Sequence, residues 1–191
     1  MTRPDFSGEG GLYRETRARA VLAATGLVQI LARSRRTLVL AESCTAGLVS
    51  DLVAEVSGAS AVLWGSFVCY SPEAKRKMLG LDGGLIDRCG PVSRETAREM
   101  AVGALRESGA SFSAAVTGIA GPLGDGSAVP VGTVLTAVAV REDSGPGVKL
   151  LAERELRFRG NRAEVRMQAA SALLGELLDL AARDGGKTAA A

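Results

Sequence analysis

Residues 37–56 read TLVLAESCTAGLVSDLVAEV, and this stretch decides the fold class. Residues 37–41 form a short apolar run with β-branched side chains, which is typical of a buried strand. Residues 42–45 are polar, and residues 47–56 have the pattern of a helix. A strand that passes through a tight polar loop into a helix presents side chains and backbone N–H groups at the start of that helix. The stretch therefore predicts an α/β fold with a candidate site in this loop.

Working outward, the rest of the chain alternates between helix and strand patterns. Further helices are predicted at residues 13–35, 72–79, 93–108 and 163–183, and further strands at 62–70, 114–117, 131–140 and 149–158. The SGPG turn at residues 144–147 predicts a hairpin between the last two strands. We expect one domain over residues 13–183, with a helix-covered mixed sheet, a flexible lead-in at 1–12 and a flexible tail at 184–191.

The composition excludes several kinds of chemistry. The 191 residues include no histidine, which rules out Ser–His–Asp and Cys–His nucleophilic systems and histidine metal ligation. Lys+Arg 23 nearly balances Asp+Glu 21, so the net charge gives no reason to expect a nucleic-acid or membrane partner. Acid–base chemistry must come from lysine, carboxylate, tyrosine or cysteine. The lysines are few: Lys75, Lys77, Lys149 and Lys187.

The cysteines indicate a reducing compartment. There are three, Cys44, Cys69 and Cys89, without a CxxC pair, so neither a zinc site nor a disulfide framework is expected. Asp82, Asp87 and Asp125 are scattered in predicted loops and form no metal-ligand cluster. The N-terminus has no apolar signal region and no stretch is long enough to span a membrane, so a cytoplasmic location is expected.

Ser43 is the first candidate nucleophile, because it lies between the predicted strand and helix. Backbone N–H groups there could hold an oxyanion when a carbonyl is attacked. An ordinary helix N-cap explains a serine at this position equally well. Cys44 is a rival, but without histidine its thiolate would depend on the helix dipole or on a lysine. A serine also needs a base, and a lysine kept neutral by burial is the strongest candidate.

Three other segments could contribute to a site. Lys75 follows a predicted strand end, and Tyr70 could orient it or a substrate, although a solvated basic helix face and a packed aromatic are the simpler interpretations. The glycine-rich loop at 118–130 could hold a phosphate or be a surface turn, and it lacks the spacing of a P-loop or dinucleotide fingerprint. Arg162 and Arg166 could bind phosphate or form surface ion pairs.

Four motifs, in order, carry a family resemblance. They are AESCTAG at 41–47, FVCYSPEAK at 67–75, VTGIAGP at 116–122 and PVGTV at 130–134. Together they resemble the CinA C-terminal domain family, whose members are nicotinamide-nucleotide amidohydrolases, also called PncC or NMN deamidases. The resemblance covers residues 37–178. The separate N-terminal domain that often accompanies this module has no room in 191 residues, so a stand-alone form is expected.

The resemblance implies a function and a set of roles. It implies a three-layer α/β/α sandwich, a homo-oligomer, and hydrolysis of the carboxamide of nicotinamide mononucleotide (NMN) to nicotinate mononucleotide and ammonia without metal or cofactor, in pyridine nucleotide recycling. The nucleophile and base fall on Ser43 and Lys75, with Tyr70 and Thr117 around the reacting centre. The candidate substrate-binding residues are Thr45, Ala46, Gly47, Gly118, Gly121 and Arg162.

The chain departs from the family pattern at three positions. Ala46 replaces a glycine, Pro72 replaces an asparagine, and Val129 replaces a lysine or arginine. These departures favour an alternative, a non-catalytic nucleotide-binding or regulatory module that keeps the pocket without turnover. A third possibility is an amidase that acts on a related carboxamide.

Overall fold

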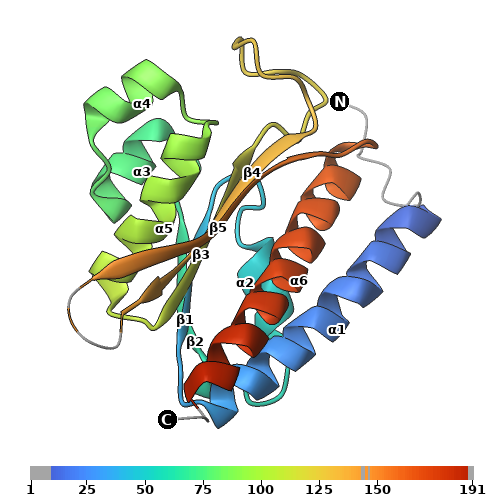
Figure 1. Cartoon of the computed structure of the whole chain (residues 1–191). Helices are drawn as coiled ribbons and strands as arrows, with labels where there is room; N and C mark the ends of the chain where they lie inside the picture. Colours follow the sequence, from blue (N-terminus) through green and yellow to red (C-terminus); the bar gives the residue numbers. More distant parts are fainter. Residues whose placement is uncertain (1–9, 143–144, 146, 189–191) are drawn as a thin grey trace.

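Five strands form one sheet, and helices cover both of its faces (Figure 1). The computed structural model describes residues 10–142, 145 and 147–188. The strands are β1 (Leu38–Glu42), β2 (Leu63–Val68), β3 (Phe112–Gly118), β4 (Thr133–Arg141) and β5 (Val148–Arg157). The helices are α1 (Gly11–Arg33), α2 (Leu48–Ala54), α3 (Pro72–Leu79), α4 (Gly83–Cys89), α5 (Arg94–Ser108) and α6 (Arg162–Thr188), with a 3-10 turn η1 (Ala59–Ala61).

The sheet is mixed, with strand order β2-β1-β3-β4-β5. β1 pairs in parallel with both β2 and β3, whereas β3, β4 and β5 pair antiparallel. Parallel neighbours need a crossover, and helices supply it between the first three strands. The predicted mixed sheet and late antiparallel hairpin are confirmed. Ser144 and Pro146 of the predicted turn lie outside the described residues.

The helices form two outer layers, so the three-layer α/β/α sandwich is confirmed. α1, α2 and α6 lie on one face of the sheet, and α3, α4 and α5 on the other (Figure 1). All five residues of β1 are buried. Leu38 and Leu40 pack with α1 and α6, and Val39 and Ala41 pack with α5. The unbroken apolar run at 37–41 therefore reflects a central strand that is covered on both faces.

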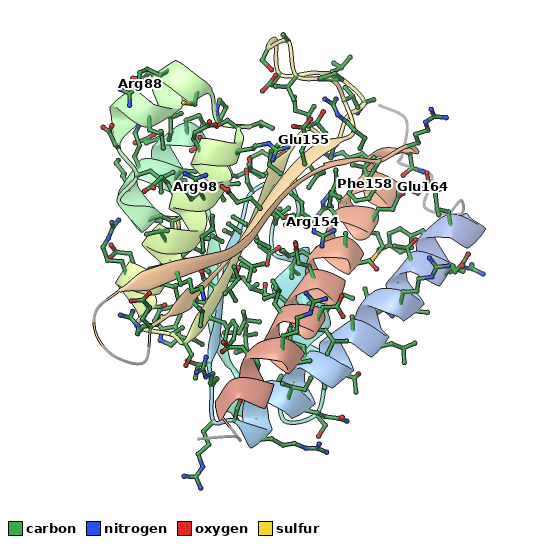
Figure 2. All side chains as sticks on the ribbon, viewed as in Figure 1. Arg88, Arg98, Arg154, Glu155, Phe158 and Glu164 are labelled. Carbon is green, nitrogen blue, oxygen red and sulfur yellow. The ribbon has the colours of Figure 1, made fainter. Side chains whose placement is uncertain are left out.

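Ion pairs hold β5 to both helical layers, and Figure 2 labels one arginine of each pair, Arg98 and Arg154. Glu153 accepts two hydrogen bonds of 2.8 Å from Arg98 of α5. The next residue, Arg154, points to the opposite face and donates to Glu176 of α6 over 2.5 Å. Successive strand residues alternate between the faces of a sheet, so this pair of neighbours contacts both layers at once.

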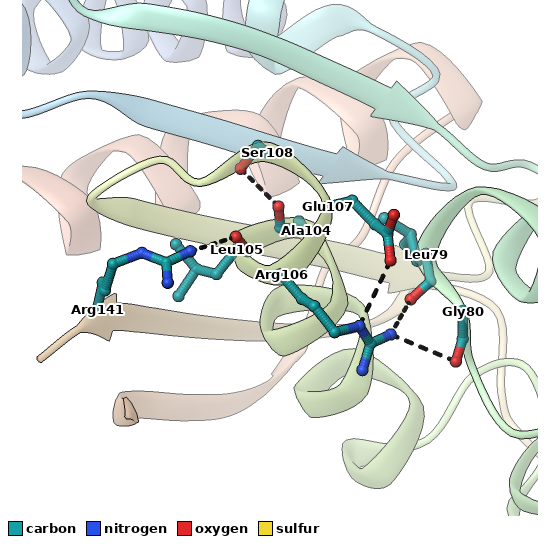
Figure 3. Close-up of polar contacts among 8 residues, drawn as sticks. All are labelled: Leu79, Gly80, Ala104, Leu105, Arg106, Glu107, Ser108 and Arg141. Carbon is teal, nitrogen blue, oxygen red and sulfur yellow. Dashed lines mark hydrogen bonds and ion pairs between the residues drawn. The ribbon is translucent and has the colours of Figure 1, made fainter. Parts of the chain in front are cut away.

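Figure 3 shows polar contacts at the junction of α3 with α5. This junction matters for the site because α3 carries Lys75. Arg106 of α5 donates to the carbonyl oxygens of Leu79 at 2.7 Å and Gly80 at 3.4 Å, at the end of α3. The two helices also approach closely at Gly103, where an added Cβ would lie 2.4 Å from the Leu79 carbonyl oxygen. This contact explains a glycine in the middle of α5 and fixes the position of the C-terminal end of α3.

The structure differs from the sequence prediction in one helix and at both ends. α4 was not predicted, because Gly83 and Gly84 occupy its first turn and glycine has low helix propensity. The Asp82 carboxylate caps this helix by accepting from the Gly84 N–H at 3.0 Å. α1 begins at Gly11 and α6 runs to Thr188, so helix extends into both segments predicted as flexible ends. In the described ranges no helix combines the length and apolarity that a bilayer span requires.

Candidate active site

The carboxyl ends of the three parallel strands meet at one edge of the sheet, and the candidate site lies there. Ser43 follows β1 directly, Tyr70 follows β2, and Thr117 is the penultimate residue of β3. Because β2 and β3 lie on opposite sides of β1, the connections diverge at this edge, as they do at the ligand-binding crevice of open α/β sheets. A cavity of about 420 Å³ opens there.

Ser43 and Lys75 meet inside this cavity. The Lys75 Nζ atom lies 2.7 Å from the Ser43 Oγ atom and donates to the Cys69 carbonyl at 3.1 Å. Lys75 is 1% exposed and Ser43 is 7% exposed. The local sequence explains the reach of the lysine: Ser71 caps α3 by accepting from the Ala74 N–H, which places Lys75 in the first turn above the end of β2.

Burial gives Lys75 the properties of a base. Removal of its ammonium from water lowers the pKa of Lys75 below its ordinary value, and the nearby Cys69 and Cys44 thiols oppose this shift. In its neutral form the amine has a lone pair directed at a hydroxyl that lies within hydrogen-bond distance. The pair can therefore act as a nucleophile and its general base without histidine.

Cys44 also lines the cavity, but its thiol is not activated. Burial raises the pKa of Cys44 to about 12, and the charges of Lys75 and Arg166 only partly oppose this rise. A thiol with this pKa stays protonated near neutral pH and is a poor nucleophile. The choice that the sequence left open between Ser43 and Cys44 therefore favours Ser43.

We expect the Cys44→Ala variant to retain activity close to wild type, because its thiol carries no step of the chemistry. It should lose about 1 kcal/mol of stability, since a buried side chain is shortened. The measurement compares the variant and wild type in release of ammonia from NMN, the substrate that the family resemblance implies. A loss as large as that of a Ser43 variant would assign the nucleophile to Cys44.

Glu42 organises the loop after β1, and sequence reasoning missed it. Its carboxylate is fully buried. It accepts hydrogen bonds from five donors, which lie on β2, on α2 and in the loop between β1 and α2. The donors are the hydroxyls of Thr45 and Ser66 and the N–H groups of Gly47, Val49 and Ser50. The signal was present in the sequence: an acidic residue in the segment that leads into a helix can accept from the unpaired N–H groups of its first turn.

Replacing Glu42 by glutamine should destabilise the fold by about 3 kcal/mol. The reason is that the glutamine NH2 group would replace a carboxylate oxygen and would lie against hydrogen-bond donors. Urea unfolding measures the change. Glu153→Gln is the matched control, since it breaks a surface pair with Arg98 and should cost less than about 1 kcal/mol. Equal stability losses in the two variants would show that the Glu42 network does not hold the loop.

The structure brings most of the predicted site residues together. Besides Ser43 and Lys75, the cavity is lined by Tyr70, Thr117, Gly118, Gly121 and Arg162. Thr117 is buried, and its hydroxyl donates to the Pro91 carbonyl at 2.9 Å. Arg162 crosses the cavity rim, donating to the Tyr70 hydroxyl and to the Gly121 carbonyl, both at 2.7 Å. Tyr70 is 57% exposed and so faces the cavity mouth.

Thr45, Ala46 and Gly47, which were predicted to bind substrate, are not among the residues that line the cavity. The Ala46 N–H donates to the Ser43 carbonyl at 3.1 Å, and the Gly47 N–H donates to Glu42 at 3.0 Å. Neither amide is available to a substrate, because the loop uses both to hold its own shape. Thr45 is fully buried, with its hydroxyl on Glu42.

The three departures from the family pattern lie in different places. Pro72 lines the cavity. Val129 lines a second cavity of about 360 Å³, beside Arg157 and Glu155. Ala46 adopts a left-handed backbone with φ 51°. Within the described ranges no group of three or more acidic or cysteine side chains is placed to hold a metal ion.

The family model, the curated relatives and the solved structures that match this chain all carry CinA-type descriptions. The family model of the CinA C-terminal domain matches residues 21–181. A "CinA-like protein" of Mycolicibacterium vanbaalenii is 40% identical over 182 residues, covering 92% of this chain and 41% of that protein. Another, from Anaeromyxobacter dehalogenans, is 44% identical over 158 residues, covering 82% of this chain and 36% of that protein. The chain thus spans about two fifths of the length of these curated relatives.

Solved structures give the same result. The competence/damage inducible protein CihA of Agrobacterium tumefaciens superposes with a TM-score of 0.78 at 37% identity, covering 85% of this chain and 95% of that one. A CinA superfamily protein of Escherichia coli superposes with a TM-score of 0.77 at 28% identity, covering 84% and 90%. The likeness therefore extends over nearly the whole of each solved chain.

Proposed function

The chain belongs to the CinA C-terminal domain family, and from this premise we propose that it is a metal-independent amidohydrolase that converts NMN to nicotinate mononucleotide and ammonia. One observation carries the proposal: a buried lysine lies 2.7 Å from a serine hydroxyl in a substrate-sized cavity. Few arrangements of side chains other than Ser–Lys can hydrolyse an amide in a chain without histidine.

The chemistry follows from the geometry. Ser43 Oγ attacks the carboxamide carbon while neutral Lys75 accepts the hydroxyl proton, which gives a tetrahedral oxyanion. As the C–N bond breaks, Lys75 returns the proton to the departing nitrogen and ammonia leaves, with a nicotinoyl ester remaining on Ser43. Lys75 then removes a proton from water as the water oxygen adds to the ester, and it returns that proton to Ser43 Oγ as the ester C–O bond breaks. The carboxylic acid product departs and loses its remaining proton to solvent, which gives the carboxylate.

The backbone after Ser43 supplies donors for the oxyanion. Ser43, Ala46 and Gly47 all use their N–H groups within the protein. In the described part of the chain, the N–H groups of Cys44 and Thr45 have no protein acceptor. An N–H of the residue after a serine nucleophile is a common oxyanion donor, and Cys44 lines the cavity, so its N–H is the candidate.

The residues that line the cavity are chemically complementary to a nicotinamide nucleotide. Pro91, Val92 and Ile119 provide apolar wall for a pyridine ring. Arg162 is a permanent cation at the rim, and the glycine-rich segment 118–121 lets backbone approach a phosphate. Lys75 does not compete for the phosphate, since its buried amine is engaged with Ser43 and Cys69.

A substrate panel tests the proposal. Ammonia release by the wild-type protein is measured with NMN, nicotinamide and NAD, with and without a chelator. We expect NMN to be the preferred substrate and the chelator to leave its rate unchanged. Equal turnover of free nicotinamide would instead indicate an amidase for a related carboxamide, and strong chelator inhibition would overturn the metal-independent mechanism.

A second candidate, a non-catalytic nucleotide-binding module, is favoured by Pro72, which lines the cavity where the family pattern has an asparagine. Calorimetry that shows NMN binding by a protein that releases no ammonia would select this candidate. The homo-oligomeric state and the cytoplasmic location stay predictions.

A further inference from the structure

Arg166 contacts the nucleophile loop, which we define as residues 43–47, from the helical layer behind it. It lies on α6 one turn after Arg162, so the two arginines share a helix face. Its Nη2 group donates to the Thr45 carbonyl oxygen. Its Nε group is enclosed by protein and has no partner among the described residues. Arg166 as a whole is half-buried, but an enclosed Nε–H with an unmade hydrogen bond is costly, which suggests a role beyond packing.

The nucleophile loop needs such an outside contact. Ala46 is held in the left-handed region with φ 51°, which costs a non-glycine residue about 1 kcal/mol. The peptide between Thr45 and Ala46 is fixed at both ends: Arg166 binds its carbonyl oxygen, and its N–H donates to the Ser43 carbonyl at 3.1 Å. Glu42 binds the far side of the loop through the Gly47 N–H. The loop is thus hydrogen-bonded to the Arg166 side chain on one side and to the Glu42 side chain on the other.

The charge of Arg166 also reaches the cavity side of this loop. Burial raises the pKa of Cys44, and of the two cations that oppose this rise, Lys75 has the larger effect and Arg166 the smaller. The charge of Arg166 therefore acts beside the N–H group of Cys44, which has no acceptor in another residue of the described structure. A positive charge behind such donors strengthens them toward a developing anion.

We propose that Arg166 is a positioning residue for the nucleophile: its bond to the Thr45 carbonyl holds the turn 43–46 so that the N–H group of Cys44, which lines the cavity, can receive the oxyanion. This rests on the proposed function insofar as Ser43 is the attacking group. The role differs from that of Arg162, which contacts the cavity rim. Loss of Arg166 should slow the chemical step and leave ground-state binding largely intact.

The first test does not depend on NMN. Phenylmethylsulfonyl fluoride modifies an activated serine: the Oγ–S bond forms, fluoride leaves, and the base takes the hydroxyl proton. We expect Arg166→Met to slow labelling of Ser43 by about 10²-fold, the effect of losing one oxyanion donor. Arg166→Lys, which keeps the charge, should restore part of the rate. Arg183→Met, an exposed arginine of the same helix, is the control and should label as wild type does.

The second test separates positioning from mere packing. With NMN as substrate, Arg166→Met should lower kcat with little change in KM, at a temperature where unfolding curves show every variant folded. If Arg166→Met labels at the wild-type rate, the positioning role is overturned whether or not NMN is the substrate. If labelling slows in Arg166→Met but wild type does not release ammonia from NMN, the NMN proposal fails and the Arg166 inference stands.

Discussion

Replacing Ser43 by alanine should reduce the rate of ammonia release from NMN by about 10⁴-fold or more, because the attacking atom is lost and water has no equally placed substitute. The side chain points into the cavity and loses only one oxygen, so the fold should be kept. Steady-state ammonia assays with NMN measure the effect. NMN affinity measured by calorimetry should change little, because Ser43 contributes to bond-making more than to binding.

The Ser43→Ala result has an internal control in Cys44, the adjacent cavity residue. If alanine at 43 left the wild-type rate while alanine at 44 removed it, the nucleophile would be the thiol. If neither substitution affected ammonia release, the cavity would not be the site of the reaction.

Lys75→Met and Lys75→Arg should both lose about 10³-fold or more of kcat/KM, since neither side chain can take a proton from Ser43. In wild type, kcat/KM should rise with pH through the lowered pKa of Lys75 and then level off, because only the neutral amine is a base. A pH–rate profile measures this. An active Lys75→Arg variant would remove the base role, because arginine stays protonated.

The same lysine predicts a pH dependence of stability. Its pKa is lowered by burial in the folded state from the ordinary lysine value of 10.5, so between the folded pKa and 10.5 the unfolded chain binds a proton that the native protein does not. The free energy of unfolding of wild type, relative to Lys75→Met, should therefore rise with pH in that window, by at most about 1.36 kcal/mol per pH unit. Below the folded pKa the full cost of the buried ammonium remains. Urea unfolding over a range of pH measures the difference, and a flat difference would show that the pKa is not lowered.

The elements that could be predicted are those whose pattern is local. The helix at 72–79 and the Ser93 cap of α5 are confirmed residue for residue, because proline and serine mark helix starts directly. The apolar run at 37–41 predicted a buried strand, and β1 is buried on both faces. α4 was missed because its glycines hide the pattern.

The site was predictable only in part. Ser43 and Lys75 are far apart in the chain, and only the parallel pairing of β1 with β2 brings them together. No local pattern contains that pairing, and the family resemblance supplied it. The roles of Glu42 and of the Ala46 and Gly47 amides were missed for a related reason. Tertiary structure buries the Glu42 carboxylate where it accepts from backbone N–H groups, and the sequence alone does not show that these N–H groups have a partner.

The central claim is that the Ser43–Lys75 cavity turns over NMN and does not only bind it. The most direct test incubates wild-type protein with NMN and quantifies ammonia and nicotinate mononucleotide in the same samples, with calorimetry to measure binding. We predict equimolar appearance of the two products. Saturable NMN binding without release of either product would contradict the account.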